Sequence, residues 1–481
     1  MGDLQHRAHP HRAHRVRARR RHRRPRNPNP ADRPPARARL NGVTTAPTVH
    51  FRLTRRSFVR SARTLASLSI LALATALAGT GGASAAPAEH AIAGTAVRWH
   101  AAWSASPQRP SANFTPNWSE QGFTDQTVRQ SVRVSLDGVA VRVRLANTYG
   151  TTPLTVTGAT VARGSGGAAA RPGSVRRLTV GGASAFTVPA GAELASDPVS
   201  LSVRALDSVT VTLYFAVPTG PATYHAQAMT ASYRATGDRT ADTRAAAFTE
   251  STASWYYLAG VDVIGAVCRR EGLVLFGDSL TDGYGSTPGA DNRYPDELAE
   301  RLAATGHPRA VLNQGIGGNR MIVDSAWLGD KATTRFHRDV LDQPGVGAVI
   351  VLAGINDIGM SEARQPLAAP HTEVSAAEII AGHRDLITRA HAKGLRIIGG
   401  TMPPTKGSRY YTPLSEAKRD EVNTWIRTSG EYDAVVDFDR ALAWPADADQ
   451  FDPAYDSGDH LHPNDAGYRA MADAVDLADL G

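Results

Sequence analysis

The segment VLFGDSLTDGYG, residues 274–285, places a serine between an apolar run and a stretch rich in glycine. The apolar run has the length of a buried strand, and Ser279 stands where that strand would turn into a helix. A serine at such a point is either a turn or capping residue, or a nucleophile displayed at the end of a strand. The second interpretation requires a base, an orienting acid and oxyanion donors elsewhere in the chain.

Short apolar runs and helical stretches alternate after about residue 270. The runs that predict strands are residues 272–276, 310–313, 346–354, 394–402 and 432–438. Apolar periodicity between them predicts helices over residues 293–306, 376–394, 413–430 and 463–478. This alternation predicts an α/β domain with a parallel sheet that is covered on both faces. In such a sheet, binding sites form beyond the carboxyl ends of the strands.

Two glycine-containing stretches supply candidate oxyanion donors. NQGIGGNR, residues 313–320, follows the second predicted strand, and its glycines leave the backbone N–H of Gly318 unobstructed. LAGINDIG, residues 352–359, follows the third strand and offers the side-chain amide of Asn356. Together with the backbone N–H of Ser279 itself, these groups would make an oxyanion hole of three donors.

A base and an orienting acid stand near the end of the chain, in DSGDHLHPND, residues 456–465. Asp459 and His462 are three residues apart, so the carboxylate can hold the imidazole while its other nitrogen faces Ser279. His460 directly adjoins Asp459, and we expect it to be a loop residue rather than the base. The two histidines could suggest a metal site, but no third or fourth ligand stands at a suitable spacing.

These four stretches, in this order, resemble the catalytic blocks of the SGNH, or GDSL, hydrolase family over roughly residues 270–481. The positions that match its blocks are Ser279 in Gly-Asp-Ser-Leu, Gly318, Asn356, and Asp459 with His462 in Asp-x-x-His. The resemblance implies a flavodoxin-like sheet, a catalytic triad of Ser279, His462 and Asp459, and an oxyanion hole of Ser279, Gly318 and Asn356. It also implies that neither a metal nor an organic cofactor is used.

Residues 98–265 alternate with a period of two, which predicts an all-β sandwich or jelly-roll-like domain. In VRVSLDGVAVRVRL, residues 132–145, Asp137 and Gly138 predict a tight hairpin between two strands. This domain could bind carbohydrate, or it could pack against the catalytic domain and shape its entrance. His225, in TYHAQAMTASY, could line a site, but a lone histidine is more often structural, and we assign it no role.

The β domain and the segment HAAWSASPQ, residues 100–108, also resemble secreted two-domain members of the SGNH family, some of which are similar to carbohydrate esterases. The polar, proline-interrupted loop at about residues 358–375 and the absence of an apolar lid-like helix favour acetylated sugars or short esters as substrates.

Residues 51–85 have the anatomy of an export signal, with a basic region, a short apolar run and small residues before Ala86. Residues 54–60 resemble the twin-arginine motif. The apolar run is too short to span a membrane, so we expect a secreted protein with no stable membrane anchor. The preceding arginine-, histidine- and proline-rich tract, residues 1–50, cannot build a core and predicts disorder. It is either an RNA-binding arm or, as we favour, a non-native extension upstream of the true start.

The charge of the chain is unevenly distributed. Residues 1–63 hold 18 arginines and two aspartates, which leaves 35 basic and 43 acidic residues and a net charge of −8 in the remainder. This argues against a nucleic-acid surface on the body of the protein. The single cysteine, Cys268, excludes an intrachain disulfide.

We therefore expect a secreted serine esterase that hydrolyses carboxylic esters through an acyl-enzyme, with an ester of acetylated carbohydrate or of a short acyl chain as its partner. The alternatives are a lipase or lysophospholipase-type lipid ester hydrolase, and a carbohydrate-binding protein with a degenerate hydrolase domain.

Overall fold

The computed structural model of the chain describes residues 98–265, 271–362 and 369–481. The basic tract and the export signal predicted for residues 1–85 lie outside the described residues, as does Cys268, so those predictions stay as they were made. Within the described ranges, no helix is both long and apolar enough to cross a membrane.

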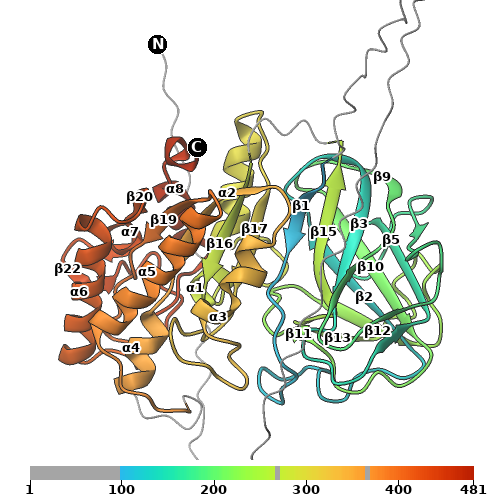
Figure 1. The fold of residues 1–481 in the computed structure, drawn as a ribbon, viewed down its shortest axis with the longest axis horizontal. Helices are drawn as coiled ribbons and strands as arrows, with labels where there is room; N and C mark the ends of the chain where they lie inside the picture. The colour runs from blue at the N-terminus through green and yellow to red at the C-terminus, as the bar shows by residue number, and fades with distance from the viewer. Residues whose placement is uncertain (1–97, 266–270, 363–368) are drawn as a thin grey trace, which may run out of the picture. The chain divides into compact units, whose positions relative to one another are not determined.

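The β domain is built from two antiparallel sheets (Figure 1). One sheet contains β1 (His100–Ser104), β15 (Leu258–Ile264), β3 (Gly138–Ala146), β8 (Glu193–Ala195) and β9 (Val199–Val203). The other contains β13 (Glu250–Thr252), β12 (Ser232–Thr236), β2 (Gln126–Arg133), β10 (Ser208–Phe215), β5 (Gly158–Arg163) and β6 (Arg176–Arg177). Two short pairs complete the domain, β11 (Tyr224–His225) with β14 (Trp255–Tyr256) and β4 (Leu154–Val156) with β7 (Phe186–Val188).

The inward faces of the two sheets share one apolar core. Val143 and Val261 from the first sheet and Val128 and Val211 from the second are fully buried in the same cluster. Burial of alternate residues from both sheets is the packing of a β-sandwich, which confirms the all-β prediction for this region.

The tight hairpin predicted at Asp137 and Gly138 is wrong. The strands on either side, β2 and β3, belong to different sheets, so this turn carries the chain across the sandwich. In the crossing segment, the Ser135 N–H donates to the Ala102 carbonyl at 2.8 Å, and the Val134 N–H donates to a carbonyl near the start of β10. An Asp-Gly pair specifies a turn, but here these distant backbone partners decide which strands it joins.

The second domain contains a five-stranded parallel sheet in the order β17-β16-β18-β19-β20. Its strands are β16 (Gly272–Gly277), β17 (Val311–Gly315), β18 (Val346–Leu352), β19 (Arg396–Gly400) and β20 (Ala434–Val436). Counted along the chain, this order is 2-1-3-4-5, the flavodoxin-like arrangement. The predicted α/β fold class is therefore confirmed. A small hairpin of β21 (Ala443–Trp444) and β22 (Asp447–Phe451), which the sequence patterns did not predict, follows the sheet.

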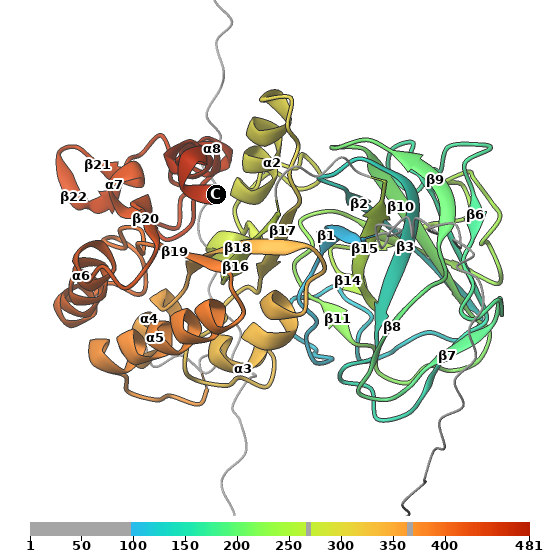
Figure 2. The same cartoon turned by 45° about the horizontal axis from the view of Figure 1, so that its top comes forward.

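Helices cover both faces of this sheet, with α2 and α8 on one side and α3, α4 and α5 on the other (Figure 2). The helices are α1 (Ser279–Asp282), α2 (Tyr294–Ala304), α3 (Ala332–Phe336), α4 (Ile355–Glu362), α5 (Ala376–Ala392), α6 (Pro413–Thr428), α7 (Phe438–Leu442) and α8 (Asp465–Ala474). Local sequence sets several starts: Ser375 and Glu378 form a capping box at α5, and Thr412 caps α6 before a proline.

The edge strand β17 is covered by side chains of the β domain. Ser135 Oγ accepts the Val311 N–H at 2.9 Å, and its single hydrogen faces the Ala102 carbonyl at 2.9 Å and the Val311 carbonyl at 3.2 Å. At the other end of β17, the Gln314 amide donates to Ser104 Oγ at 2.7 Å and accepts from Ser106 Oγ at 2.6 Å. Ser104 and Ser106 belong to the segment HAAWSASPQ, so that segment forms part of the contact between the domains.

Candidate active site

Ser279 is positioned by the end of the central strand β16. The strand ends at Gly277, and the Asp278 side chain caps the next turn by accepting the Leu280 N–H at 3.0 Å. No side chain fits at Gly277, because a Cβ there would lie 2.2 Å from the Leu352 carbonyl oxygen. The helix that follows, α1, has only four residues, so oxyanion stabilisation depends on individual N–H groups rather than on a long helix dipole.

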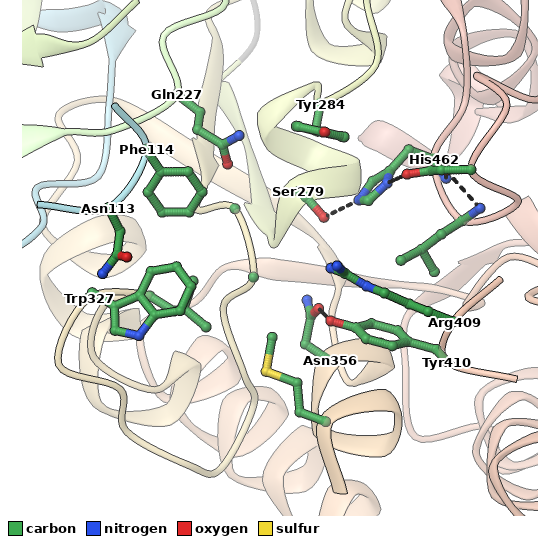
Figure 3. A pocket seen from close by; sticks show the side chains of 16 residues that line it. Asn113, Phe114, Gln227, Ser279, Tyr284, Trp327, Asn356, Arg409, Tyr410 and His462 are labelled. Atoms are coloured by element: carbon green, nitrogen blue, oxygen red, sulfur yellow. Dashed lines mark hydrogen bonds and ion pairs between the residues drawn. The ribbon is translucent and has the colours of Figure 1, made fainter. Parts of the chain in front are cut away.

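The structure brings Ser279, His462 and Asp459 into one hydrogen-bonded series (Figure 3). Ser279 Oγ lies 2.8 Å from His462 Nε2, and His462 Nδ1 lies 2.6 Å from Asp459 Oδ2. Ser279 and His462 are each 7% exposed, so both remain reachable from the cavity while most of their surface is protected. This is the arrangement of nucleophile, base and orienting acid found in serine hydrolases.

Asp459 is held in its ionised form by its neighbours. Burial alone would raise the pKa of its carboxyl, but the hydrogen bond and charge of His462, together with backbone N–H donors, bring the pKa well below its ordinary value. The donors are the N–H groups of Leu461, at 3.0 Å, and of His462, at 2.9 Å, both to Asp459 Oδ1. The carboxylate therefore stays an acceptor for the His462 ring at neutral pH.

The residues that carry the three predicted oxyanion donors, Ser279, Gly318 and Asn356, line one cavity. Within the described part of the chain, neither the Ser279 N–H nor the Gly318 N–H donates to another residue. Gly318 has φ +74°, and a Cβ there would also meet Leu328 at 2.6 Å, so this position requires glycine. The Asn356 amide nitrogen gives one hydrogen to the Asn319 carbonyl at 3.1 Å, and the same side chain interacts with the buried Asp278 carboxyl beside the nucleophile.

Tyr410 fixes the orientation of Asn356, a contact that the sequence did not reveal. Its hydroxyl donates to Asn356 Oδ1 at 3.1 Å, so the amide nitrogen faces the cavity (Figure 3). Tyr410 comes from the loop between β19 and α6, and no motif in the sequence distinguishes it.

Two buried carboxyl groups lie beneath the nucleophile, at Asp278 and Asp357. Asp357 accepts the N–H groups of Met321 at 2.5 Å and Ile322 at 3.1 Å, so it anchors the chain just after the Gly318 loop. Burial raises the pKa of Asp278 to about 7 and the pKa of Asp357 to about 6. The sequence patterns did not single out Asp357 for this anchoring role.

The cavity beside Ser279 has a volume of about 560 Å³ and is lined by residues of both domains. The β domain contributes Asn113, Phe114 and Gln227, which sequence patterns did not single out. Phe114 contacts Trp327 of the catalytic domain, with ring centroids 5.4 Å apart. Phe114 has φ +57°, a strained conformation for a bulky residue, and strained residues of this kind cluster at functional sites.

His460 lies apart from the triad interactions. Its Nδ1 pairs with Asp456 Oδ2 at 2.5 Å, and its side chain is 53% exposed. This agrees with its expected place as a loop residue. Among the residues that the structure describes, no group of three His, Cys, Asp or Glu side chains could hold a metal ion.

The fold and the site together define a serine hydrolase with a flavodoxin-like catalytic domain. Residues 275–470 match the family model of the GDSL-like Lipase/Acylhydrolase family. The catalytic domain therefore belongs to the GDSL-like lipase/acylhydrolase family, and the chain is a carboxylic ester hydrolase. No curated protein matches the chain.

Three solved structures that are similar to the chain each cover less than half of it. A GDSL-like lipase from Bacteroides thetaiotaomicron is 16% identical over 44% of this chain and 87% of its own, with a TM-score of 0.32. An acetyl xylan esterase from Geobacillus stearothermophilus is 23% identical over 44% and 94%, with a TM-score of 0.35. An alpha/beta hydrolase enzyme from the metagenome of Lake Arreo, Spain, is 26% identical over 44% and 95%, with a TM-score of 0.34.

Proposed function

We propose that this protein is a secreted serine esterase that hydrolyses esters of acetylated carbohydrates, or other short-chain esters, through an acyl-enzyme. The observation that carries the proposal is the hydrogen-bonded series of Ser279, His462 and Asp459 beside a cavity with three N–H donors. Secretion is proposed from the export signal in residues 51–85.

In the first half of the reaction, His462 Nε2 takes the proton of Ser279 Oγ as Oγ bonds to the ester carbonyl carbon. The carbonyl oxygen becomes an oxyanion that accepts hydrogen bonds from the Ser279 and Gly318 N–H groups and the Asn356 amide. Each such donor is worth roughly 2.7–4 kcal/mol in the transition state. When the C–O bond to the alcohol breaks, His462 gives its proton to the leaving oxygen.

In the second half, His462 Nε2 deprotonates a water molecule, whose oxygen bonds to the acyl carbon. The intermediate collapses as Ser279 Oγ leaves and regains the proton from His462, releasing the carboxylic acid. Asp459 keeps Nδ1–H of His462 as a donor throughout, so that Nε2 faces Ser279 in both steps.

The residues that line the cavity favour a carbohydrate as the alcohol part of the ester. Phe114 and Trp327 are both partly exposed and offer aromatic faces to the apolar face of a sugar ring. The side-chain amides of Asn113 and Gln227 lie beside them and can both donate to and accept from hydroxyl groups (Figure 3). Leu328, Met360 and Leu461 also line the cavity, so a lipid ester remains the alternative substrate.

A second candidate is an ester whose substrate also carries an acidic group. Arg409 lines the cavity, and its guanidinium points toward the space between Ser279 and Asn356 (Figure 3). In the described ranges, Arg409 has no carboxylate partner within ion-pair distance, and its guanidinium lies over the Tyr410 ring, 5.3 Å from the ring centroid. A cation in the cavity that has no carboxylate partner favours a carboxylate-bearing substrate, such as an acetylated uronic-acid oligosaccharide.

The test is a hydrolysis panel with purified protein, containing acetylated neutral oligosaccharides, acetylated acidic oligosaccharides and aryl esters of rising acyl length. Phe114→Ala and Trp327→Ala should raise KM for the oligosaccharide esters and leave aryl acetate turnover nearly unchanged. Trp444→Ala is the matched control, because Trp444 is 38% exposed and does not line the cavity. Preference for long acyl chains, with no effect of either aromatic variant on oligosaccharide KM, would contradict the carbohydrate proposal.

A further inference from the structure

A buried histidine of the β domain reaches the catalytic domain behind the Gly318 loop. His225, in β11, is 3% exposed, and Asp282, the last residue of α1, is 2% exposed. His225 Nε2 lies 3.0 Å from Asp282 Oδ1, and His225 Nδ1 lies 3.0 Å from the Ser106 carbonyl oxygen. Each ring nitrogen of His225 therefore faces an oxygen acceptor.

Both nitrogens of His225 must carry a proton for both contacts to be hydrogen bonds, since a neutral imidazole has only one N–H. Burial alone would lower the pKa of His225, but the charge of Asp282 and the hydrogen bonds to Asp282 and Ser106 raise it, against a smaller repulsion from Arg293. The two side chains thus form a buried imidazolium–carboxylate pair between the domains.

The second oxygen of Asp282 holds the loop that carries the oxyanion donor. Asp282 Oδ2 accepts the Gly317 N–H at 2.9 Å, and the next residue is Gly318. Asp282 therefore connects His225 on one side to the Gly317–Gly318 segment on the other. Without His225, this buried carboxylate would lose its hydrogen-bonded cation and would keep only the charge of Arg293 nearby.

A second residue of the same β-domain segment also lies against the Gly317–Gly318 segment. Gln227, two residues after His225, lies so close to Gly317 that a Cβ there would be 1.7 Å from Gln227 Oε1. A larger residue at position 317 would therefore require the Gln227 side chain to move. At the start of the loop, Ser106 Oγ also accepts from Arg335 at 3.1 Å and donates to Gln314 at 2.6 Å. The β domain therefore contacts the loop before and at Gly317.

We propose that His225 is a positioning residue that orients the Gly317–Gly318 segment through Asp282, so that the Gly318 N–H faces the oxyanion. The β domain is then part of the catalytic apparatus and not only a wall of the substrate cavity. This inference rests on the proposed role of Gly318 as an oxyanion donor. A group that acts on the oxyanion stabilises the transition state more than the bound substrate, so its loss lowers kcat with little effect on KM.

The experiment compares the full-length native protein, His225→Ala and His225→Gln with an aryl acetate as substrate. The Gln amide nitrogen reaches about as far as Nε2 and keeps a donor to Asp282, so it is the conservative variant. We expect His225→Ala to lower kcat by at least about 10-fold, toward the roughly 10²–10³-fold lost with a whole oxyanion donor, while KM changes by less than about 3-fold. His225→Gln should recover part of kcat.

A trifluoromethyl ketone supplies a readout that a purely structural role would not move. Its adduct with Ser279 places an oxyanion among the same donors, so its affinity should fall by the same factor as kcat/KM in each variant. A His225→Ala protein that is folded by circular dichroism and keeps kcat within about 2-fold of native would overturn the inference. So would a loss confined to KM.

If His225→Ala does not fold, His225→Asn replaces it in the comparison, because its shorter amide reaches only the position of Nδ1. We then expect kcat to decrease from the native protein to His225→Gln and further to His225→Asn. Equal kcat values in all three proteins would overturn the inference. Failure of the proposed function is recognised separately: the native protein would not hydrolyse aryl acetate, or Ser279→Ala would hydrolyse it as well as the native protein does.

Discussion

Ser279 Oγ and His462 Nε2 lie 2.8 Å apart, although 183 positions separate the two residues in the chain. The first follows the central strand β16, and the second lies in the loop before the last helix, α8. The carboxyl ends of the parallel strands bring this loop and the nucleophile to one edge of the sheet. This distance lets one proton pass directly between nucleophile and base.

The triad gives a ranked mutational prediction. Ser279→Ala should reduce ester hydrolysis to background, and His462→Ala should be nearly as severe, because nucleophile and base act as a unit. Asp459→Ala should be milder, since it removes orientation of the base rather than the base itself. His460→Ala is the control and should change little, because His460 pairs with Asp456 in the loop. Steady-state kinetics on folded proteins decide this, and an inactive His460→Ala would show that the base is misassigned.

Asn356 and Tyr410 should differ in their contributions to catalysis. Asn356→Ala deletes one oxyanion donor and should lower kcat by roughly 10²–10³-fold. Tyr410→Phe removes only the hydroxyl that orients the Asn356 amide, so kcat should fall by about 10-fold or less. Comparing kcat and KM of both variants with an aryl acetate tests this order. Equal losses in the two variants would mean that Tyr410 has a further role.

The buried Asp278 should make stability depend on pH. Its pKa is about 7 in the folded protein, above its ordinary value of 3.8, so the folded state binds more protons between these values. The free energy of unfolding should therefore decrease as pH rises from about 4 to 7. Asp278→Asn keeps an oxygen for the Leu280 N–H. It should reduce this pH-dependent change in the free energy of unfolding by up to about 4 kcal/mol.

Urea unfolding of the native protein and of Asp278→Asn at pH 5 and pH 8 measures the difference. His225 titrates in both proteins, so the comparison reports the effect of Asp278 together with its coupling to the neighbouring Asp357. Asp459, whose pKa is lowered, loses its stabilising effect only at acidic pH, below this window. Identical pH slopes for the two proteins would exclude an ionisation of Asp278 in this range.

Export should depend on the paired arginines of the signal segment. Arg55 and Arg56 stand before the apolar run in the stretch that resembles a twin-arginine motif. Replacing both with lysine should retain the protein inside the cell, as judged by comparing culture supernatant with cell contents. Undiminished secretion would argue for a general export signal instead. N-terminal sequencing of secreted protein should begin near Ala86.

The main strands and longer helices of the catalytic domain were predictable because each has a local sequence pattern. The apolar run at residues 272–276 corresponds to β16, and the periodic stretch at residues 376–394 corresponds to α5. Glycine is also a local signal in the sequence. Gly318 has a left-handed backbone that other residues avoid, so its position in the loop could be recognised from the sequence. Short helices without periodicity, such as α3, were missed for the converse reason.

Contacts between the domains were not predictable from the sequence. Phe114 and Gln227 follow no period, and only the packing of the two domains brings them to the cavity. The turn at Asp137 was misinterpreted because a local turn signal does not report that Ser135 bonds to Val311. His225 looked like a structural histidine for the same reason, since its partner Asp282 belongs to the other domain.

The covering of strand β17 has a consequence for any shortened form of the protein. β17 is the edge of the parallel sheet, and Ser135 Oγ accepts the Val311 N–H and lies 3.2 Å from the Val311 carbonyl oxygen. A catalytic domain cut away from the β domain would expose an unpaired strand edge, which is a template for pairing with another molecule. Such a fragment is expected to self-associate, so the β domain also keeps its neighbour from aggregating.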